Sequence, residues 1–144
     1  MGVLYGYFAA ADDDDAVRAV VRDDGETSGT GYDQLVVKGM DPVVNLAPAE
    51  ALLTGRSDAQ SGALVGMLGD GEVVVVTVAD AFRDALAAAD PASFSEIATA
   101  WSNDEDAFLD PVDPDDLHDF LDELSGLAAR AVDHRARLYC WICP

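Results

Sequence analysis

The hydrophobic residues of the chain form short β-favouring runs, separated by longer stretches in which apolar positions recur at helical spacing. Five runs are predicted to form strands: residues 3–8, 35–37, 63–68, 72–78 and 138–143. The third and fourth runs flank Gly69-Asp70-Gly71, and Asp-Gly between apolar runs is a strong hairpin signal. Val73 to Val76 do not alternate with polar residues, so this strand is expected to be buried on both faces.

Aspartates mark most of the predicted helix starts. Asp precedes Pro at residues 90–91 and again at residues 113–114, where the carboxylate is expected to cap a helix whose first position is the proline. Asp12 to Asp15 are expected to begin a short first helix, because carboxylates are favourable at the positive end of the helix dipole. Another helix is expected over residues 47–53, with Asn45 as its cap and Gly55 at its end.

The longest predicted helix begins at Asp113 and carries a single apolar stripe: Leu117, Phe120, Leu121, Leu124, Leu127, Ala128 and Ala131. Two shorter helices precede it, with apolar positions at Phe82, Leu86 and Ala89 and at Phe94, Ile97 and Trp101. This order of elements predicts one α+β domain over residues 1–144, with a small, mostly antiparallel sheet packed against four to five helices.

The charge of the chain is strongly acidic, with 28 Asp and Glu against 8 Lys and Arg and a net charge of -20. Nucleic acids and anionic membranes bind Lys and Arg, so we expect neither as a partner. A basic protein is the electrostatically complementary partner. Lys38 is the only lysine and Asp greatly outnumbers Glu. A GC-rich source of the actinobacterial type, or a salt-adapted one, is therefore an alternative origin of the acidity.

The first residues lack the basic region and long apolar run of a signal peptide, because the apolar run stops at Asp12. No other run approaches the ~20 apolar residues that a membrane span requires. We therefore expect a cytoplasmic protein.

Cys140 and Cys143 form the most conspicuous motif. A redox pair of this spacing lies where a strand leads into a helix, but here only Pro144 follows. In a strand, residues three apart point to opposite faces and lie roughly 10 Å apart, beyond the ~7 Å limit for a disulfide. We therefore expect two core thiols and no redox site.

Metal sites are not expected either. His118 and His134 are about 24 Å apart along one predicted helix, so they cannot share a zinc ion with the two cysteines. His118 has acidic neighbours within one helical turn, a pattern that could hold a metal or tune a base but is typical of a solvated face. Counted from Asp104, a calcium loop would need Gly and Glu where the chain has Leu109 and Asp115. We expect no cofactor and assign no catalytic residue.

The order of elements, together with Leu52-Leu53-Thr54-Gly55, resembles the YfbM-like family of small bacterial proteins of unknown function. The resemblance implies an α+β fold. Members tend to carry Trp and His just before the tetrapeptide, where this chain has residues 46–50 without either, so a polar site built there is not expected here.

Three functions remain open. The first is a non-catalytic module, of the immunity or inhibitor type, that binds a basic partner through Asp104, Glu105, Asp106, Asp110, Asp115, Asp116, Asp119, Asp122 and Glu123. The second is an enzyme or small-ligand protein with His118 or His134 beside a pocket lined by Tyr5, Tyr7, Trp101, Tyr139 and Trp141. The third is a DNA mimic, which would need two rows of carboxylates at phosphate-like spacing.

Overall fold

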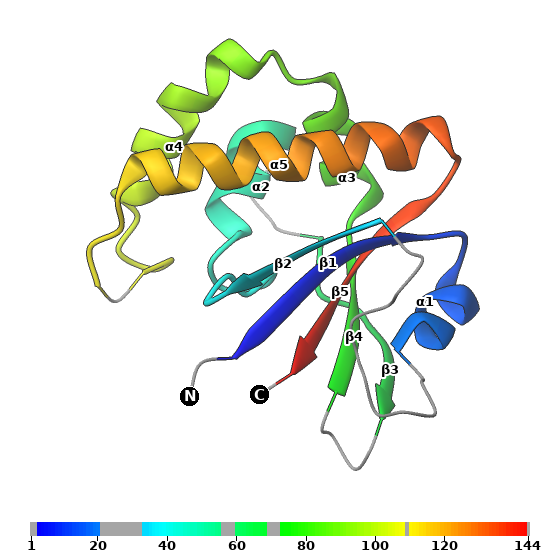
Figure 1. Ribbon diagram of the computed structural model, residues 1–144. Coiled ribbons are helices and arrows are strands. Elements are labelled where there is room, and N and C mark those ends of the chain that lie inside the picture. Colours follow the sequence, from blue (N-terminus) through cyan, green and yellow to red (C-terminus); the bar gives the residue numbers. More distant parts are fainter. Residues whose placement is uncertain (1–2, 21–32, 56–59, 69–72, 109, 144) are drawn as a thin grey trace.

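The computed structural model describes residues 3–20, 33–55, 60–68, 73–108 and 110–143. Its centre is a five-stranded sheet in the order β2-β1-β5-β4-β3, in which every neighbouring pair is antiparallel (Figure 1). The strands are β1 (Leu4–Ala10), β2 (Gln34–Lys38), β3 (Leu64–Leu68), β4 (Val73–Val78) and β5 (Arg137–Cys143). All five predicted strands are therefore present, and the last run of the chain lies in the middle of the sheet.

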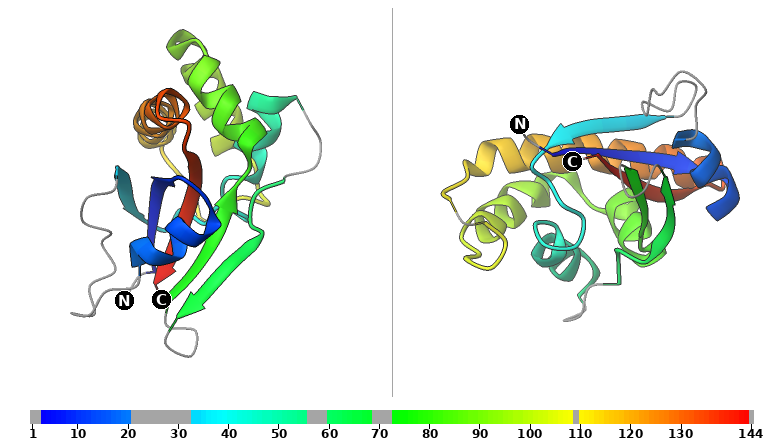
Figure 2. Two further views of the ribbon diagram at one scale, coloured as in Figure 1. Left: turned by 90° about the vertical axis from the view of Figure 1, so that its right-hand side faces the viewer. Right: turned by 90° about the horizontal axis from the view of Figure 1, so that it is seen from below.

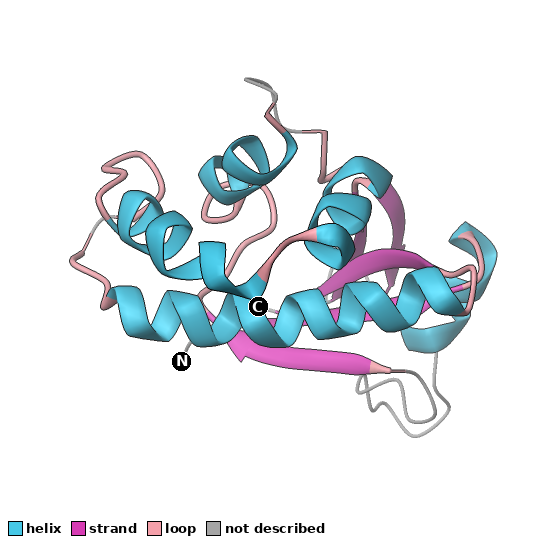
Figure 3. Cartoon of the chain, turned by 90° about the horizontal axis from the view of Figure 1, so that it is seen from above, coloured by secondary structure: helices cyan, strands magenta, loops and turns pink. Residues whose placement is uncertain are grey.

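Helices cover both faces of the sheet, giving the predicted α+β class (Figure 2). They are α1 (Asp13–Val20), α2 (Ala47–Thr54), α3 (Asp80–Ala88), α4 (Phe94–Ser102) and α5 (Pro114–Asp133). A short 3-10 helix, Pro91–Ser93, runs directly into α4. Helices α2 to α5 pack on one face, where α5 runs alongside the other three, and α1 lies against the opposite face (Figure 3).

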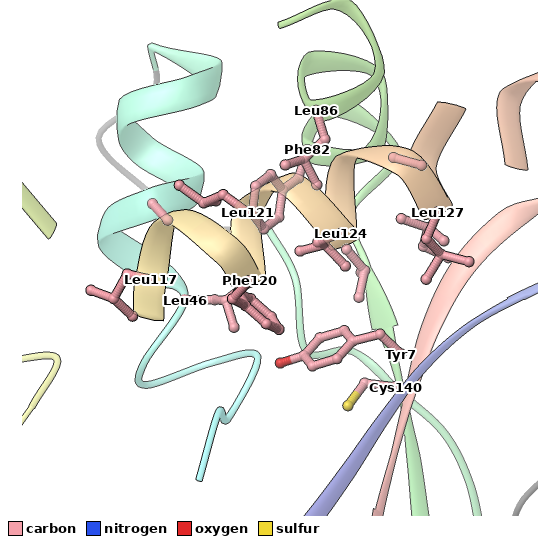
Figure 4. Close-up of a cluster of buried hydrophobic side chains, with 14 of the residues drawn as sticks. Tyr7, Leu46, Phe82, Leu86, Leu117, Phe120, Leu121, Leu124, Leu127 and Cys140 are labelled. Carbon is pink, nitrogen blue, oxygen red and sulfur yellow. The ribbon is translucent and has the colours of Figure 1, made fainter. Parts of the chain in front are cut away.

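The larger core lies between α5 and the sheet. All seven residues of the predicted α5 stripe are buried, which confirms the helical pattern. Tyr7 and Cys140 extend from the central strands toward this stripe, and the ring of Tyr7 meets that of Phe120 edge-on at 5.6 Å (Figure 4). Each fully buried Leu contributes about 1.5–3 kcal/mol relative to an exposed one, so this stripe fixes α5 on the sheet.

A smaller core lies on the other face of the sheet. Strand β4 contributes to both cores, with Val73 and Val75 on this side and Val76 and Val78 on the other. The prediction of a strand buried on both faces is confirmed. Gly6 is required here for space, since a Cβ at this position would lie 2.0 Å from the indole of Trp141.

Aspartate side chains begin three helices, as predicted. Asp12 accepts from the Asp15 amide at 2.8 Å, Asp90 from the Ala92 amide at 3.0 Å, and Asp113 from the Asp115 amide at 2.9 Å. Each carboxylate satisfies an amide that the helix leaves without an intrahelical partner.

The predicted cap at Asn45 is wrong. Leu46 occupies the cap position of α2 without a side-chain hydrogen bond. Asn45 instead uses both ends of its amide elsewhere, accepting from the Asp41 amide at 2.8 Å and donating to the Ala107 carbonyl at 2.6 Å. Gly55 ends α2 in the left-handed conformation, with φ of 73°, as expected. The Gly69-Asp70-Gly71 turn lies outside the described residues, although β3 and β4 pair as its hairpin predicts.

Candidate functional site

The nine predicted partner-binding acids lie on the segment before α5 and on the outer side of that helix. Asp104 is half-buried and the other eight are exposed. Asp115, Asp119 and Asp122 follow helical spacing on the side opposite the buried stripe. Asp115 and Asp116 lie in the first turn of α5, where negative charge is favourable. We call this set of nine residues the acidic surface.

No Lys or Arg accompanies the acidic surface in the sequence. Residues 84–129 contain 13 of the 28 acidic residues of the chain and neither Lys nor Arg. Within the described part of the chain, the single ion pair of the acidic surface joins Asp119 to His118, with 3.8 Å between carboxylate and Nδ1, and it requires a protonated His118. Negative charge therefore accumulates here without a local counter-charge.

Arginines pair with acids at the other end of α5. The Arg130 guanidinium makes two hydrogen bonds to Asp33, at 2.5 and 3.2 Å, and these bonds raise the Arg130 pKa. Arg137 bridges Asp80 at 3.2 Å and Asp13 at 3.6 Å. Arg83 contacts Asp80 as well, at 3.5 Å. Each of these three arginines is thus paired with an acid within the fold.

Asp104 has a structural role in addition to its charge. Its Oδ1 accepts from the amides of Asp106 at 2.9 Å and Ala107 at 3.1 Å, which fixes a tight turn after α4. Asp41 organises a second turn in the same way, accepting from the amides of Val43 at 2.7 Å and Val44 at 2.9 Å. Both turns are therefore held by their own carboxylates.

Asn45 joins these two turns. Besides its bond to the Ala107 carbonyl, its own carbonyl accepts from the Trp101 indole nitrogen at 2.7 Å. Two adjacent depressions of about 310 and 420 Å³ lie on the surface where the turns meet. We call them together the Val44 hollow; they are lined by Val44, Asn45, Ala47, Pro48, Ala51, Asp104, Asp106, Ala107, Phe108, Asp110 and Val112.

The two cysteines lie on opposite faces of the sheet, as predicted. Cys140 belongs to the larger core and Cys143 packs against the smaller one, and both are free thiols. Burial, followed by the charge of Asp41, raises the pKa of Cys140. A thiol held protonated in an apolar core is a poor nucleophile.

The two histidines lie at separate positions on α5. His118 is half-buried, with its ring edge-on to Phe94 at 6.4 Å. His134 is exposed at the end of the helix, where its amide donates to the Arg130 carbonyl at 3.1 Å. Among the described residues, no three side chains of the metal-ligating types gather at one point. Neither histidine lines the Val44 hollow.

The five aromatic residues expected to line a pocket are packed in the cores instead, each at most 9% exposed: Tyr5, Tyr7, Trp101, Tyr139 and Trp141. The Tyr7 hydroxyl donates to the Met40 carbonyl at 2.5 Å, and the Tyr139 hydroxyl donates to Asp13 at 2.7 Å. Burial is the main cause that raises the pKa of both phenols. Both hydroxyls make hydrogen bonds within the fold, and the five rings are packed in the cores. These residues therefore do not form the pocket on which the enzyme hypothesis rested.

Glu50 is a buried acid that the sequence pattern did not single out. Its side chain is 2% exposed and accepts from the Gln60 amide at 2.5 Å and from the Ser61 hydroxyl. The same hydroxyl accepts from the Ala79 amide at 2.9 Å, immediately before α3. Glu50 therefore ties α2 to the segments before β3 and α3. Its one sequence signal is an acid on the otherwise apolar helix over residues 47–53.

No known protein family, curated protein or solved structure matches this chain. The resemblance to the YfbM-like family stays a prediction. Among the described residues, no helix has the length and apolar character needed to cross a membrane.

Proposed function

We propose that this protein is a non-catalytic interaction module that binds a basic protein through the acidic surface. The observation that carries the proposal is the separation of charge along α5. Acids near the start of the helix have no Lys or Arg partner among the described residues, whereas Asp33, Asp80 and Asp13 near its end are each paired with an arginine. Unpaired charge of one sign attracts a partner of opposite sign and accelerates its association.

The test compares two variants that lose the same charge in different places. The surface variant carries Asp119→Asn, Asp122→Asn and Glu123→Gln. The control variant carries Asp14→Asn, Asp84→Asn and Asp133→Asn, three exposed acids outside the acidic surface. Each immobilised protein is incubated with a lysate of the source organism, and captured proteins are identified by mass spectrometry at low and raised salt.

The proposal expects a basic protein that the wild type and the control variant retain, that raised salt releases, and that the surface variant loses. Equal capture by both variants, or capture that is indifferent to salt, would contradict it. Duplex DNA added as competitor tests the DNA-mimic alternative. DNA should release a captured DNA-binding protein, as expected for a mimic, but should not release a basic partner that has no DNA-binding site.

A further inference from the structure

The lining of the Val44 hollow combines apolar residues with acidic ones. Val44 is 56% exposed and lines both depressions, with Ala107 also common to the two. Asp104, Asp106 and Asp110 belong to the same lining. The hollow is therefore continuous with the acidic surface, since these three acids are members of both.

The hollow is held in shape before any partner arrives. The carboxylates of Asp41 and Asp104 fix the two turns, and the Asn45 side chain fastens one turn to the other through the Ala107 carbonyl. Ordering loops on binding consumes free energy, so a rigid surface binds more tightly than a mobile one of the same composition. Val44 is thus presented by backbone that needs no rearrangement.

We propose that the Val44 hollow receives an aliphatic side chain of the basic partner, flanked by Arg or Lys residues that reach Asp104, Asp106 and Asp110. This inference rests on the proposed function and adds the kind of segment that the partner presents. Charge complementarity selects this occupant, because every charged residue of the lining is acidic and the others, apart from Asn45, are apolar. A second copy of this chain carries a net charge of -20 and would bring acid against acid.

The test uses two synthetic peptides of equal charge, Gly-Arg-Arg-Leu-Arg-Arg-Gly and Gly-Arg-Arg-Gly-Arg-Arg-Gly, both with blocked ends. Each is titrated into the ¹⁵N-labelled full-length protein at low salt and followed by amide chemical shifts. We expect the Leu peptide to bind about three- to tenfold more tightly, since partial burial of a Leu side chain at an open surface is worth less than full burial. The largest shifts are expected at Val44 and Ala107.

Two variants locate the apolar contribution. Val44→Ser removes the apolar contact without changing charge and should lower the affinity of the Leu peptide to that of the Gly peptide. Val132→Ser is the matched control, because Val132 is 42% exposed near the other end of α5 and should leave the preference for Leu intact.

The outcomes separate the two proposals. Equal binding of both peptides at the acidic surface, unchanged by Val44→Ser, would overturn the hollow as an anchor site and leave the acidic surface as the binding site. A preference for Leu with shifts centred elsewhere would also overturn it. Binding of neither peptide to the acidic surface would count against the proposed function itself.

Discussion

Acidic residues near the two ends of α5 differ in whether they contact an arginine. Near the end of the helix, Asp33, Asp80 and Asp13 each contact an arginine. Near its start, Asp115, Asp122 and their neighbours face solvent without one. Both ends rest on one continuous buried stripe. The net charge of the chain is therefore a poor guide to its surface, because, in the described part of the chain, arginines pair with several acids at one end of α5 and with none of the acidic surface at the other.

The stripe that both ends share should give the largest effect on stability. Leu124 is fully buried at the middle of α5, and its replacement by Ala should lower the free energy of unfolding by about 2–5 kcal/mol. Urea unfolding measures the loss. The exposed Val132→Ala serves as control and should change stability by well under 1 kcal/mol. Similar losses in both variants would mean that α5 is not fixed by its stripe.

Aspartates near the start of α5 should differ among themselves. Asp113→Ala removes the cap on the Asp115 amide and should lower the free energy of unfolding by about 1 kcal/mol. Asp122→Ala removes only an exposed charge and should leave stability nearly unchanged. Thermal unfolding of the two variants in the same buffer makes the comparison. Equal losses of stability in the two variants would contradict the distinction between an acid that caps the helix and one that only carries surface charge.

Alkaline pH should lower the stability of the core beneath α5. Carboxylates are already ionised in this pH range, so they do not account for the loss. The Cys140 pKa lies above its ordinary value of 9.0 in the folded protein because the thiol is buried. Above about pH 9 the unfolded chain binds fewer protons than the folded one, so stability falls as pH rises. Between pH 9 and 10 this group should account for about 1 kcal/mol of the loss.

Urea unfolding at several pH values measures that slope. In Cys140→Ala, the free energy of unfolding should fall less steeply with pH than in the wild type. The smaller side chain also lowers stability at pH 8, but that loss does not affect the slope. Cys143→Ala keeps Cys140 and should retain its contribution. A slope unchanged by Cys140→Ala would show that the buried thiol does not control the alkaline loss.

The smallest effects test the charge comparison directly, and they should have opposite signs. Asp80→Asn weakens contacts with Arg83 and Arg137 and should cost about 0.5–1 kcal/mol. Glu123→Gln relieves repulsion from Asp119 four positions earlier and should gain about 0.2–0.5 kcal/mol. Both changes should shrink in concentrated salt, which screens exposed charges. Changes of the same sign would remove the distinction between the two ends.

The sequence by itself determined what depends on neighbours within a helical turn or a strand. The Asp-Pro starts at residues 90 and 113 act over two positions, and the α5 stripe follows from a repeat of 3.6 residues. The unbroken valine run of β4 and the opposite faces of Cys140 and Cys143 follow from the two-residue period of a strand. The acidic character of the surface could also be predicted from the sequence, since few Lys or Arg are present to offset it.

Only the tertiary structure decided which distant residues meet. Asn45 joins Ala107 across 62 positions, and Arg130 joins Asp33 across 97. Local pattern favoured Asn45 as a helix cap, but its side-chain amide instead bonds to Asp41 of its own turn and to Ala107 of another. The burial of Glu50 and the exposure of Val44 likewise depend on segments brought together by the fold. Periodicity records the face on which a residue lies, whereas the partner across that face is fixed by how the sheet and its helices pack.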